Sequence, residues 1–293
     1  MSDSQRPDVI VVGAGSAGCV LADRLSSRGL SVLVLEAGPD IAIGETPVGI
    51  DGKSFFAALE EPGRRWLDLM AQRVVGQEQR EYARGRGVGG SSAVNAMLGL
   101  WGEVEDYDSW ERDFGCAGWS WRDVEPYFRR IEIPLTQADV GASSRIGAGL
   151  FEACRNEGWL WHRGPYPLGA VGSDVGPAML TRTSDGHRVS AADIYLNRAR
   201  QRPHVQVVCD VLVDRVAIEN DQAVGVVLAD GTFIAAAEVV VAAGAIHSPA
   251  ILLRSGIDRP GIGQGLQDHP SAPLTIALAE SCSPSELAVT TLA

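Results

Sequence analysis

Three glycines near the start of the chain, Gly13, Gly15 and Gly18, have a spacing suited to holding a phosphate group. They follow an apolar run, residues 8–12, that predicts a buried parallel strand, and they open a segment with apolar residues at helical spacing. Gly13 would permit the tight turn, Gly15 would let a pyrophosphate approach, and Gly18 would let the helix pack closely on the strand. Free N–H groups and the dipole at the helix start favour phosphate. The segment predicts a dinucleotide site; an ordinary glycine-rich turn is the alternative interpretation.

An acidic residue, Glu36, follows a second apolar run at residues 31–35. It stands 18 residues after Gly18, where a carboxylate can accept hydrogen bonds from the ribose hydroxyls of an adenosine. A carboxylate in this place repels a 2′-phosphate, so NADP is disfavoured. These residues alone do not separate FAD from NAD.

A second glycine-rich stretch, ARGRGVGGSSAVNAM at residues 83–97, offers consecutive backbone N–H groups and two hydroxyls. Glycines would let the backbone come within hydrogen-bonding distance of an anion or a flat polar ring, because no Cβ stands in the way. The alternative is a glycine-rich surface loop. If the stretch does hold a ligand, strands and helices elsewhere in the chain must position it.

The later part of the chain predicts such elements. Short apolar runs at residues 204–208, 211–218, 223–228 and 233–235 are separated by turn signals and predict a β-meander. Residues 238–241 predict a strand that runs into the small residues AAGA and then a helix. That junction is another place where backbone can approach a cofactor.

Several stretches resemble the glucose–methanol–choline (GMC) oxidoreductases, a family of flavoproteins. YARGRGVGGSSAVNAMLGLWG resembles the first signature of the family, and GAIHSPAILLRSGI resembles the second. Residues 105–132 resemble its DYD-W … GW-W-DV-PYF segment, and HRVSAADIYLNRARQRPHVQVV resembles the entry to the second half of the flavin domain. GLQDHP resembles its NLQDH segment, with Gly265 where asparagine is usual. The resemblance covers nearly the whole chain.

The resemblance implies an α/β fold. It comprises a Rossmann-like FAD-binding domain, with a mostly parallel sheet plus the β-meander, and an incomplete α+β substrate domain. The expected FAD-binding domain is discontinuous, residues 1–105 and 186–265. Residues 106–185 and 266–293 are expected to form a partial substrate or cap domain, in which Ser271 to Ala279 would be the first strand.

The resemblance also implies FAD as the cofactor. Valine occupies position 94, where some members carry a histidine bonded covalently to the flavin, so the FAD is expected to be non-covalent. The residues expected to bind it are Gly13, Gly15, Ser16, Ala17, Gly18, Glu36, Ala37, Arg86, Gly90, Ser91, Asn95, Ala96, Met97, Leu98, Val213 and Ala243.

By the same resemblance, the expected activity is oxidation of the CH–OH group of an alcohol, with hydride passing from the substrate carbon to flavin N5. The family's catalytic pair, a His with an Asn or a second His, is expected beyond the end of this chain. A truncated alcohol or choline dehydrogenase-like enzyme is therefore one hypothesis. A non-catalytic FAD-binding fragment, or half of a split enzyme, is the alternative, and an NAD-binding Rossmann protein is a weaker one. The particular alcohol, the electron acceptor and the oligomeric state are not readable from the sequence.

The histidines are interpreted as structural. His247, in AIHSP, is expected at a helix start, and His269, in QDHP, is expected to give structural support. His162, His187 and His204 have no ligand spacing. Most of the tryptophans are expected to pack helices of the segment that covers the flavin domain.

Composition argues against several other classes of partner and site. With 25 Lys and Arg against 37 Asp and Glu, the formal charge is −12, which argues against nucleic acid as a partner. Five scattered cysteines form no CxxC pair, so no metal site is expected. No signal peptide or apolar run of membrane-spanning length is visible, and the expected location is the cytoplasm.

Overall fold

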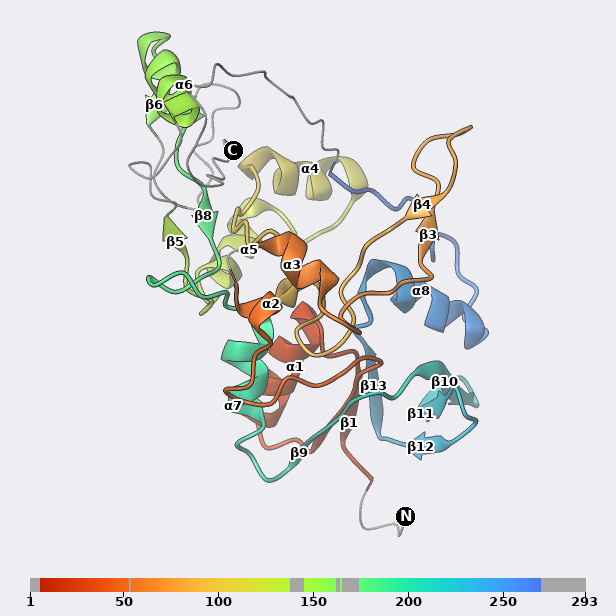
Figure 1. Cartoon of the computed structure of the whole chain (residues 1–293). Coiled ribbons are helices and arrows are strands. Elements are labelled where there is room, and N and C mark those ends of the chain that lie inside the picture. Colours follow the sequence, from red (N-terminus) through yellow and green to blue (C-terminus); the bar gives the residue numbers. More distant parts are fainter. Residues whose placement is uncertain (1–5, 53, 138–144, 162–163, 165–173, 270–293) are drawn as a thin grey trace. The chain divides into compact units, whose positions relative to one another are not determined.

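The computed structural model describes residues 6–52, 54–137, 145–161, 164 and 174–269. The chain divides into two compact units (Figure 1). The first comprises Met1–Ala96 and Gly186–His269, and the second Met97–Asp185 and Pro270–Ala293. The strand predicted at Ser271 to Ala279 lies outside the described residues.

A four-stranded parallel sheet forms the centre of the first unit. Its order is β13-β1-β2-β9, with β1 at Val9–Val12, β2 at Val32–Leu35, β9 at Val205–Val208 and β13 at Glu238–Val241. β1 is buried along its whole length. Continuous β-branched and aliphatic runs of this kind suit strands that are covered on both faces.

Helices cover one face of this sheet (Figure 1). Helix α1 (Ser16–Ser26) packs against a π-helical segment, η3 (Ala192–Leu196), which continues into α7 (Asn197–Ala199). The predicted strand–turn–helix–strand order of the first 36 residues is confirmed.

An antiparallel sheet covers the other face, formed by β10 (Val213–Glu219), β11 (Gln222–Leu228) and β12 (Phe233–Ala235). Helix α8 (Gly244–Arg254) packs beside β10. The shared hydrophobic core between these layers includes Ile10, Val12, Leu35, Val213, Val216, Val226 and Ile251.

One part of the predicted β-meander is wrong. The run at residues 204–208 does not join β10–β12; its strand β9 pairs in parallel with β2, from Val32↔Val205 to Leu35↔Val208. The parallel edge of β2 was open to it, and the chain turns away only after Asp210, which has a left-handed backbone (φ 56°). The other three runs form the antiparallel sheet as predicted.

The sequence shows no clean periodicity from residue 37 to about residue 76, and the described residues between 37 and 96 form only short elements. These are α2 (Val48–Asp51), α3 (Phe55–Glu60), the β3 (Met70–Ala71) and β4 (Arg80–Glu81) pair, and a 3-10 turn, η2 (Gly90–Ala93). The second glycine-rich stretch therefore lies almost entirely in the first unit, as a loop that continues into the 3-10 turn η2.

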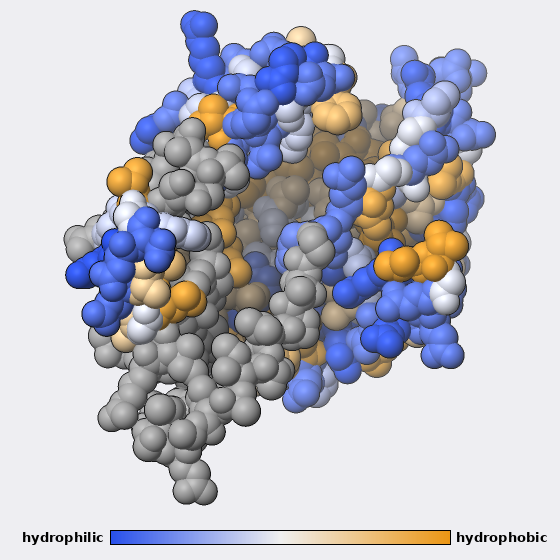
Figure 2. Space-filling model, turned by 90° about the horizontal axis from the view of Figure 1, so that it is seen from above, coloured by the Kyte–Doolittle hydropathy of each residue, from blue (hydrophilic) through white to orange (hydrophobic). Residues whose placement is uncertain are grey.

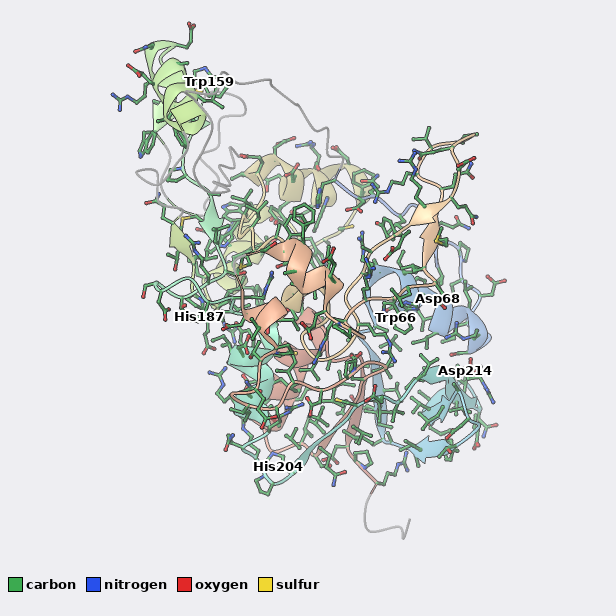
Figure 3. The ribbon with its side chains drawn as sticks, viewed as in Figure 1. Trp66, Asp68, Trp159, His187, His204 and Asp214 are labelled. Carbon is green, nitrogen blue, oxygen red and sulfur yellow. The ribbon has the colours of Figure 1, made fainter. Side chains whose placement is uncertain are left out.

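The second unit contains three helices among its described residues: α4 (Val104–Phe114), α5 (Trp121–Phe128) and α6 (Arg145–Asn156). Short pairs join β5 (Thr136–Gln137) to β8 (Met179–Leu180) and β6 (Leu160–Trp161) to β7 (Asp174–Val175). Aromatic rings connect α4 and α5, with Tyr107 5.5 Å from Trp121 and 5.6 Å from Phe128 between ring centroids. The predicted packing role of tryptophan is confirmed for Trp121, whereas Trp159 is exposed (Figure 3).

The face of the molecule seen in Figure 2 is mostly hydrophilic, with hydrophobic residues scattered among the hydrophilic ones. Within the described part of the chain, no helix combines the length and the apolar character needed to cross a bilayer.

Candidate cofactor site

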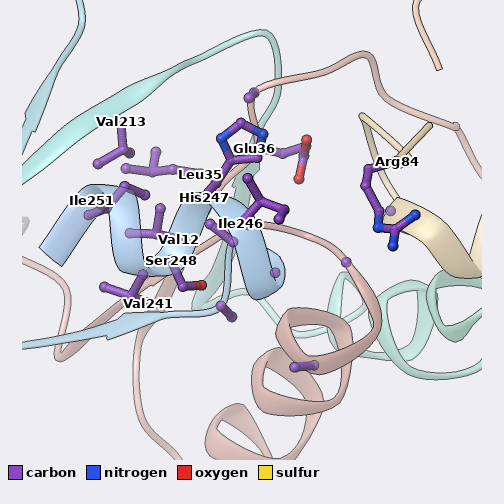
Figure 4. A pocket seen from close by; sticks show the side chains of 18 of the residues that line it. Val12, Leu35, Glu36, Arg84, Val213, Val241, Ile246, His247, Ser248 and Ile251 are labelled. Carbon is purple, nitrogen blue, oxygen red and sulfur yellow. The ribbon is translucent and has the colours of Figure 1, made fainter. Parts of the chain in front are cut away.

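A cavity of about 510 Å³ opens in the first unit at the carboxyl ends of β13, β1 and β2 (Figure 4). Ligands of parallel α/β sheets bind at this edge, and the volume lies within the usual range for small-molecule sites. Its wall takes Gly13 after β1, Glu36 after β2 and Ala242 after β13. Three separate segments therefore meet around one space.

The turn between β1 and α1 is built for close backbone approach. Gly13 has φ 101°, and a Cβ on it would lie 2.7 Å from the carbonyl oxygen of Ala242. A Cβ on Gly18 would lie 1.8 Å from the carbonyl oxygen of Gly13, so only glycine lets α1 sit this close to the turn. Gly13 lines the cavity, whereas Gly18 lies behind it and serves the packing.

The first amides of α1 face the cavity without a side-chain cap. Gly15 is the N-cap residue and makes no side-chain capping bond, and Gly15, Ser16 and Ala17 all line the cavity. The partial positive charge of the helix start is therefore available to an anion.

The second glycine-rich stretch lies against this helix start. A Cβ on Gly90 would come within 2.7 Å of the Cα of Gly15, and Gly90 has φ 52°. The backbone N–H of Gly85 donates to Oγ of Ser91 at 3.1 Å, and all three of Gly85, Gly90 and Ser91 line the cavity. The two glycine motifs, more than seventy residues apart, thus form one wall.

Glu36 is buried and already binds three backbone amides. Its Oε2 accepts from the N–H of Ala14 at 2.7 Å, and its Oε1 accepts from Gly38 at 2.9 Å and Gly87 at 3.0 Å. The carboxylate holds both glycine-rich segments at the end of β2. Oε2, with one amide donor, keeps acceptor capacity toward the cavity, so the predicted ribose contact stays a prediction.

Arg84 is a cation in the cavity wall, and its conformation is fixed by two neighbours. Its guanidinium lies 3.8 Å over the ring of Tyr82 and its Nη2 donates to Oδ2 of Asp268 at 2.7 Å. The hydroxyl of Tyr82 donates to the same oxygen at 2.6 Å. The QDHP segment is thereby tied to the start of the glycine-rich stretch.

The aromatic pair of His247 and Trp66 also lines the cavity, with ring centroids 4.2 Å apart. His247 lies in the first turns of α8, which agrees with its predicted place at a helix start. Figure 4 shows Val12, Leu35, Val213 and Ile251 gathered toward one end of the cavity, with Glu36 and His247 next to each other. Burial lowers the pKa of His247, and the charge of Arg254 lowers it further.

Most of the predicted binding residues meet at this cavity: Gly13, Gly15, Ser16, Ala17, Glu36, Ala37, Gly90, Ser91, Val213 and Ala243. Arg86 does not line it; its Nη2 donates to the carbonyl oxygen of Ala37, which braces the loop. Asn95 and Ala96 are exposed, and Asn95 Oδ1 accepts from Arg188 at 3.0 Å. Met97 and Leu98 belong to the second unit, where the carbonyl oxygen of Met97 accepts from Thr181 at 2.8 Å.

Sequence reasoning missed several lining residues, among them Trp66, Arg84, Gly85, His247, Ser248 and Arg254. Arg84 and Gly85 stand in the second glycine-rich stretch, and His247 and Ser248 follow Ala243 closely, so proximity to those motifs was an available signal. Trp66 carried no signal, because it comes from a stretch without periodicity. Arg254 is held by Asp214, with its Nε 2.9 Å from Oδ1 of that residue.

Comparisons with known proteins agree with this architecture. The family model described as GMC oxidoreductase matches residues 7–271. The chain is 36% identical over 304 residues to the oxygen-dependent choline dehydrogenase of Paraburkholderia phymatum, covering 89% of this chain and 51% of that protein. It is 34% identical to the protein of the same name from Pectobacterium atrosepticum, with coverages of 94% and 55%. The chain spans about half the length of the curated relatives it matches.

Solved structures give the same result. Pyridoxine 4-oxidase from Mesorbium loti superposes with a TM-score of 0.76 at 30% identity, over 86% of this chain and 52% of that one. An FAD-dependent oxidoreductase from Chaetomium thermophilum superposes with a TM-score of 0.74 at 26% identity, over 86% and 48%. Since the family model matches most of the chain, the chain belongs to the GMC oxidoreductase family.

Proposed function

We propose that the first unit binds FAD in this cavity, as the cofactor-holding part of an oxidoreductase that acts on the CH–OH group of a small alcohol. The observation that carries the proposal is the meeting of the two glycine motifs, with Gly15 and Gly90 in backbone contact beside the uncapped start of α1. That wall offers amide donors and a helix dipole to a diphosphate.

The residues present fit FAD. Gly15, Ser16 and Ala17 would hold the diphosphate, and Glu36 would accept from the ribose of the adenosine. Gly90 and Ser91 would hold the diphosphate from the other side. Arg84 would add a positive charge near these anionic groups.

Non-covalent binding is part of the proposal. Val94 is buried in a hydrophobic cluster with Ile50, Ala58 and Ala93, and an aliphatic side chain offers no atom for a bond to the flavin. Affinity would then come from the amides, the aliphatic walls around Val213 and the exclusion of water by the closely packed glycine loops.

When bound, the flavin would supply N5 as the acceptor of hydride from the substrate carbon. The chain's own cavity residues would bind and orient the cofactor, and the flavin-binding unit would act together with the rest of a complete family enzyme. The names of the relatives, choline dehydrogenase and pyridoxine 4-oxidase, favour a small alcohol as substrate.

A second candidate is a non-catalytic FAD-binding fragment or half of a split enzyme. It is favoured by one observation, the coverage of only 51% to 55% of the choline dehydrogenases. In that case the protein would bind FAD as proposed but leave alcohols unchanged.

Titration with FAD, followed by quenching of flavin fluorescence, tests the binding proposal. We expect saturable binding and a visible flavin spectrum after gel filtration. Anaerobic addition of choline or a simple alcohol then separates the two candidates, since bleaching supports the oxidoreductase and an unchanged spectrum supports the fragment. A folded protein that retains no flavin would overturn both.

A further inference from the structure

We propose that Ser92 is a positioning residue of the cofactor site: its hydroxyl fixes the 3-10 turn η2 from outside the cavity, and so sets the place of Gly90 and Ser91 in the cavity wall. The proposal rests on the proposed function above, because it gives Ser92 a role in binding the diphosphate of the cofactor. Ser92 is not among the described residues that line the cavity, so it would act only through its neighbours.

The first observation is that the Ser92 hydroxyl joins two distant segments. Its Oγ donates to the carbonyl oxygen of Gly89 at 2.6 Å and accepts from the backbone N–H of Ala191 at 3.1 Å, across 99 positions of sequence. Ala191 is 2% exposed and does not line the cavity. The hydroxyl therefore connects the start of η2 to a buried segment behind the cavity wall.

The second observation is that the turn depends on contacts of this kind. Gly89 and Gly90 have φ values of 89° and 52°, so two successive residues have a left-handed backbone. Glycine loses more backbone freedom on folding than any other residue, and hydrogen bonds must specify such a pair because it has no side chains to pack. The N–H of Gly89 donates to the carbonyl oxygen of Ala14 at 2.8 Å, and its C=O accepts from Ser92. Gly89 is thus fixed on both sides.

A second contact ties the other end of the turn to the same buried segment. Arg188 is 6% exposed, and its Nη1 donates to the carbonyl oxygen of Asn95 at 2.7 Å and to Oδ1 of that residue at 3.0 Å. The N–H of Asn95 in turn donates to the carbonyl oxygen of Ser91 at 2.9 Å. Burial lowers the pKa of Arg188 to about 10, so the guanidinium is charged at pH 7 and its hydrogen bonds are strengthened. The segment from Arg188 to Ala191 therefore binds both ends of η2.

The position that these bonds fix is a narrow one. A Cβ on Gly90 would lie 2.7 Å from the Cα of Gly15, so the turn is already in backbone contact with the start of α1. Without the Ser92 hydroxyl, the carbonyl oxygen of Gly89 keeps only the N–H of Ser92, at 3.1 Å, and the N–H of Ala191 loses its acceptor. Binding groups work only when their supporting contacts hold them within about 0.5 Å of the productive geometry. A looser turn would therefore weaken the binding of a diphosphate.

The test compares three probes, FAD, ADP and adenosine, on the 293-residue chain and on its variants. Ser92→Ala removes the hydroxyl, and we expect it to weaken the binding of FAD and ADP by about tenfold each. Adenosine has no phosphate, so its affinity should be unchanged. Ser92→Thr keeps a hydroxyl and should recover most of the loss.

Ser255→Ala is the matched control. Oγ of Ser255 donates to the carbonyl oxygen of Ile251 at 2.7 Å and accepts from the backbone N–H of Val216 at 2.8 Å, which is the same pair of bonds that Ser92 makes. Ser255 does not line the cavity. Both alanine variants should lower the urea midpoint, because each leaves an amide without its acceptor. Only Ser92→Ala should also lower the affinity for ADP, and this difference separates positioning from a purely structural role.

The outcomes separate this proposal from the proposed function. An ADP affinity that falls equally in the two alanine variants, or in neither, would overturn the positioning role, as would an equal loss for adenosine. Failure of the unmodified chain to bind FAD and ADP would instead overturn the proposed function, and this assignment with it. Should Ser92→Ala not fold, amide hydrogen exchange of the unmodified chain decides. ADP should slow the exchange of the Ala191 N–H more than that of the Val216 N–H, and equal slowing contradicts the proposal.

Discussion

The backbone N–H of Gly87 donates to Oε1 of Glu36 at 3.0 Å, across 51 positions of sequence. The same carboxylate holds the N–H of Ala14, in the turn before α1, and of Gly38, just after β2. One buried side chain thus fixes the strand end, the first glycine turn and the second glycine-rich loop. Loss of any of these three bonds would leave one of the segments without its contact to the end of β2.

Glu36→Gln is expected to destabilise the first unit by about 1–3 kcal/mol, because an NH₂ group would replace one acceptor oxygen and leave a buried amide unsatisfied. Urea denaturation measures this change, and FAD affinity should fall with it. Glu238→Gln, at the exposed start of β13, is the matched control and should change neither quantity. Equal denaturation midpoints for the Glu36 variant and the unmodified chain would contradict the structural role.

Gly18→Ala is expected to cost at least about 2 kcal/mol, since its Cβ would lie 1.8 Å from the carbonyl oxygen of Gly13 and would push α1 off the turn. Gly149→Ala in helix α6 is the control: its Cβ meets nothing within 4 Å, and alanine there should gain up to about 1 kcal/mol. Thermal unfolding measures both changes in stability, the loss for Gly18→Ala and the gain for Gly149→Ala. A harmless Gly18→Ala would mean that the close packing of α1 on β1 is not required.

Local patterns were enough to predict the first unit in outline. The apolar run at β1, the glycine spacing and the strand ending at Glu36 each depend on residues a few positions apart, so short-range chemistry specifies them. The partner of β9 and the place of Trp66 depend on contacts between distant segments, which no local pattern encodes. The same holds for the triple amide contact of Glu36: the sequence marks an acid after a strand, but only the folded chain brings Gly87 to it.

Asp23→Asn is expected to destabilise the contact between α1 and α7. The Asp23 side chain is 1% exposed, and it accepts from Arg198 Nη2 at 2.7 Å and from Arg202 Nη1 at 3.0 Å. Removing a buried partner leaves the two arginines uncompensated, although their own partial exposure limits the cost to about 1–3 kcal/mol.

The contact of Asp23 with the two arginines should also make the stability of the protein depend on pH. Burial opposes the ionisation of Asp23, but the hydrogen bonds from Arg198 and Arg202 outweigh it and lower the pKa below the ordinary value. A lowered folded pKa gives stability that is present above about pH 4 and is lost as the pH falls through the folded pKa. Urea midpoints measured from pH 7 to pH 3 should therefore fall less steeply for Asp23→Asn. Parallel pH curves for the two proteins would refute the contribution of this carboxylate.

Tyr82→Phe tests the tie between the QDHP segment and the cavity wall. The hydrogen bond from Tyr82, followed by that from Arg84, lowers the pKa of Asp268 to about 2. Without the tyrosine hydroxyl, the carboxylate keeps Arg84 but loses its first donor, so the pKa of Asp268 should rise toward the ordinary value near 4. Because the folded pKa is lowered, the stability from this contact is present above about pH 4 and is lost as the pH falls toward 2. In Tyr82→Phe, less stability should be lost as the pH falls over this range.

Carboxyl ¹³C titration measures the pKa of Asp268 directly. Asp230 is the internal control, because its pKa is lowered by bonds from Thr232, which Tyr82 does not contact. We expect the Asp268 resonance to begin titrating at higher pH in Tyr82→Phe while Asp230 is unchanged. Arg84 should also become less well held, since it would lose its bond to the hydroxyl while it keeps the aromatic ring beneath it. An unchanged Asp268 titration in a folded variant would show that Arg84 alone holds this carboxylate, and that the QDHP segment reaches the cavity wall through one bond rather than two.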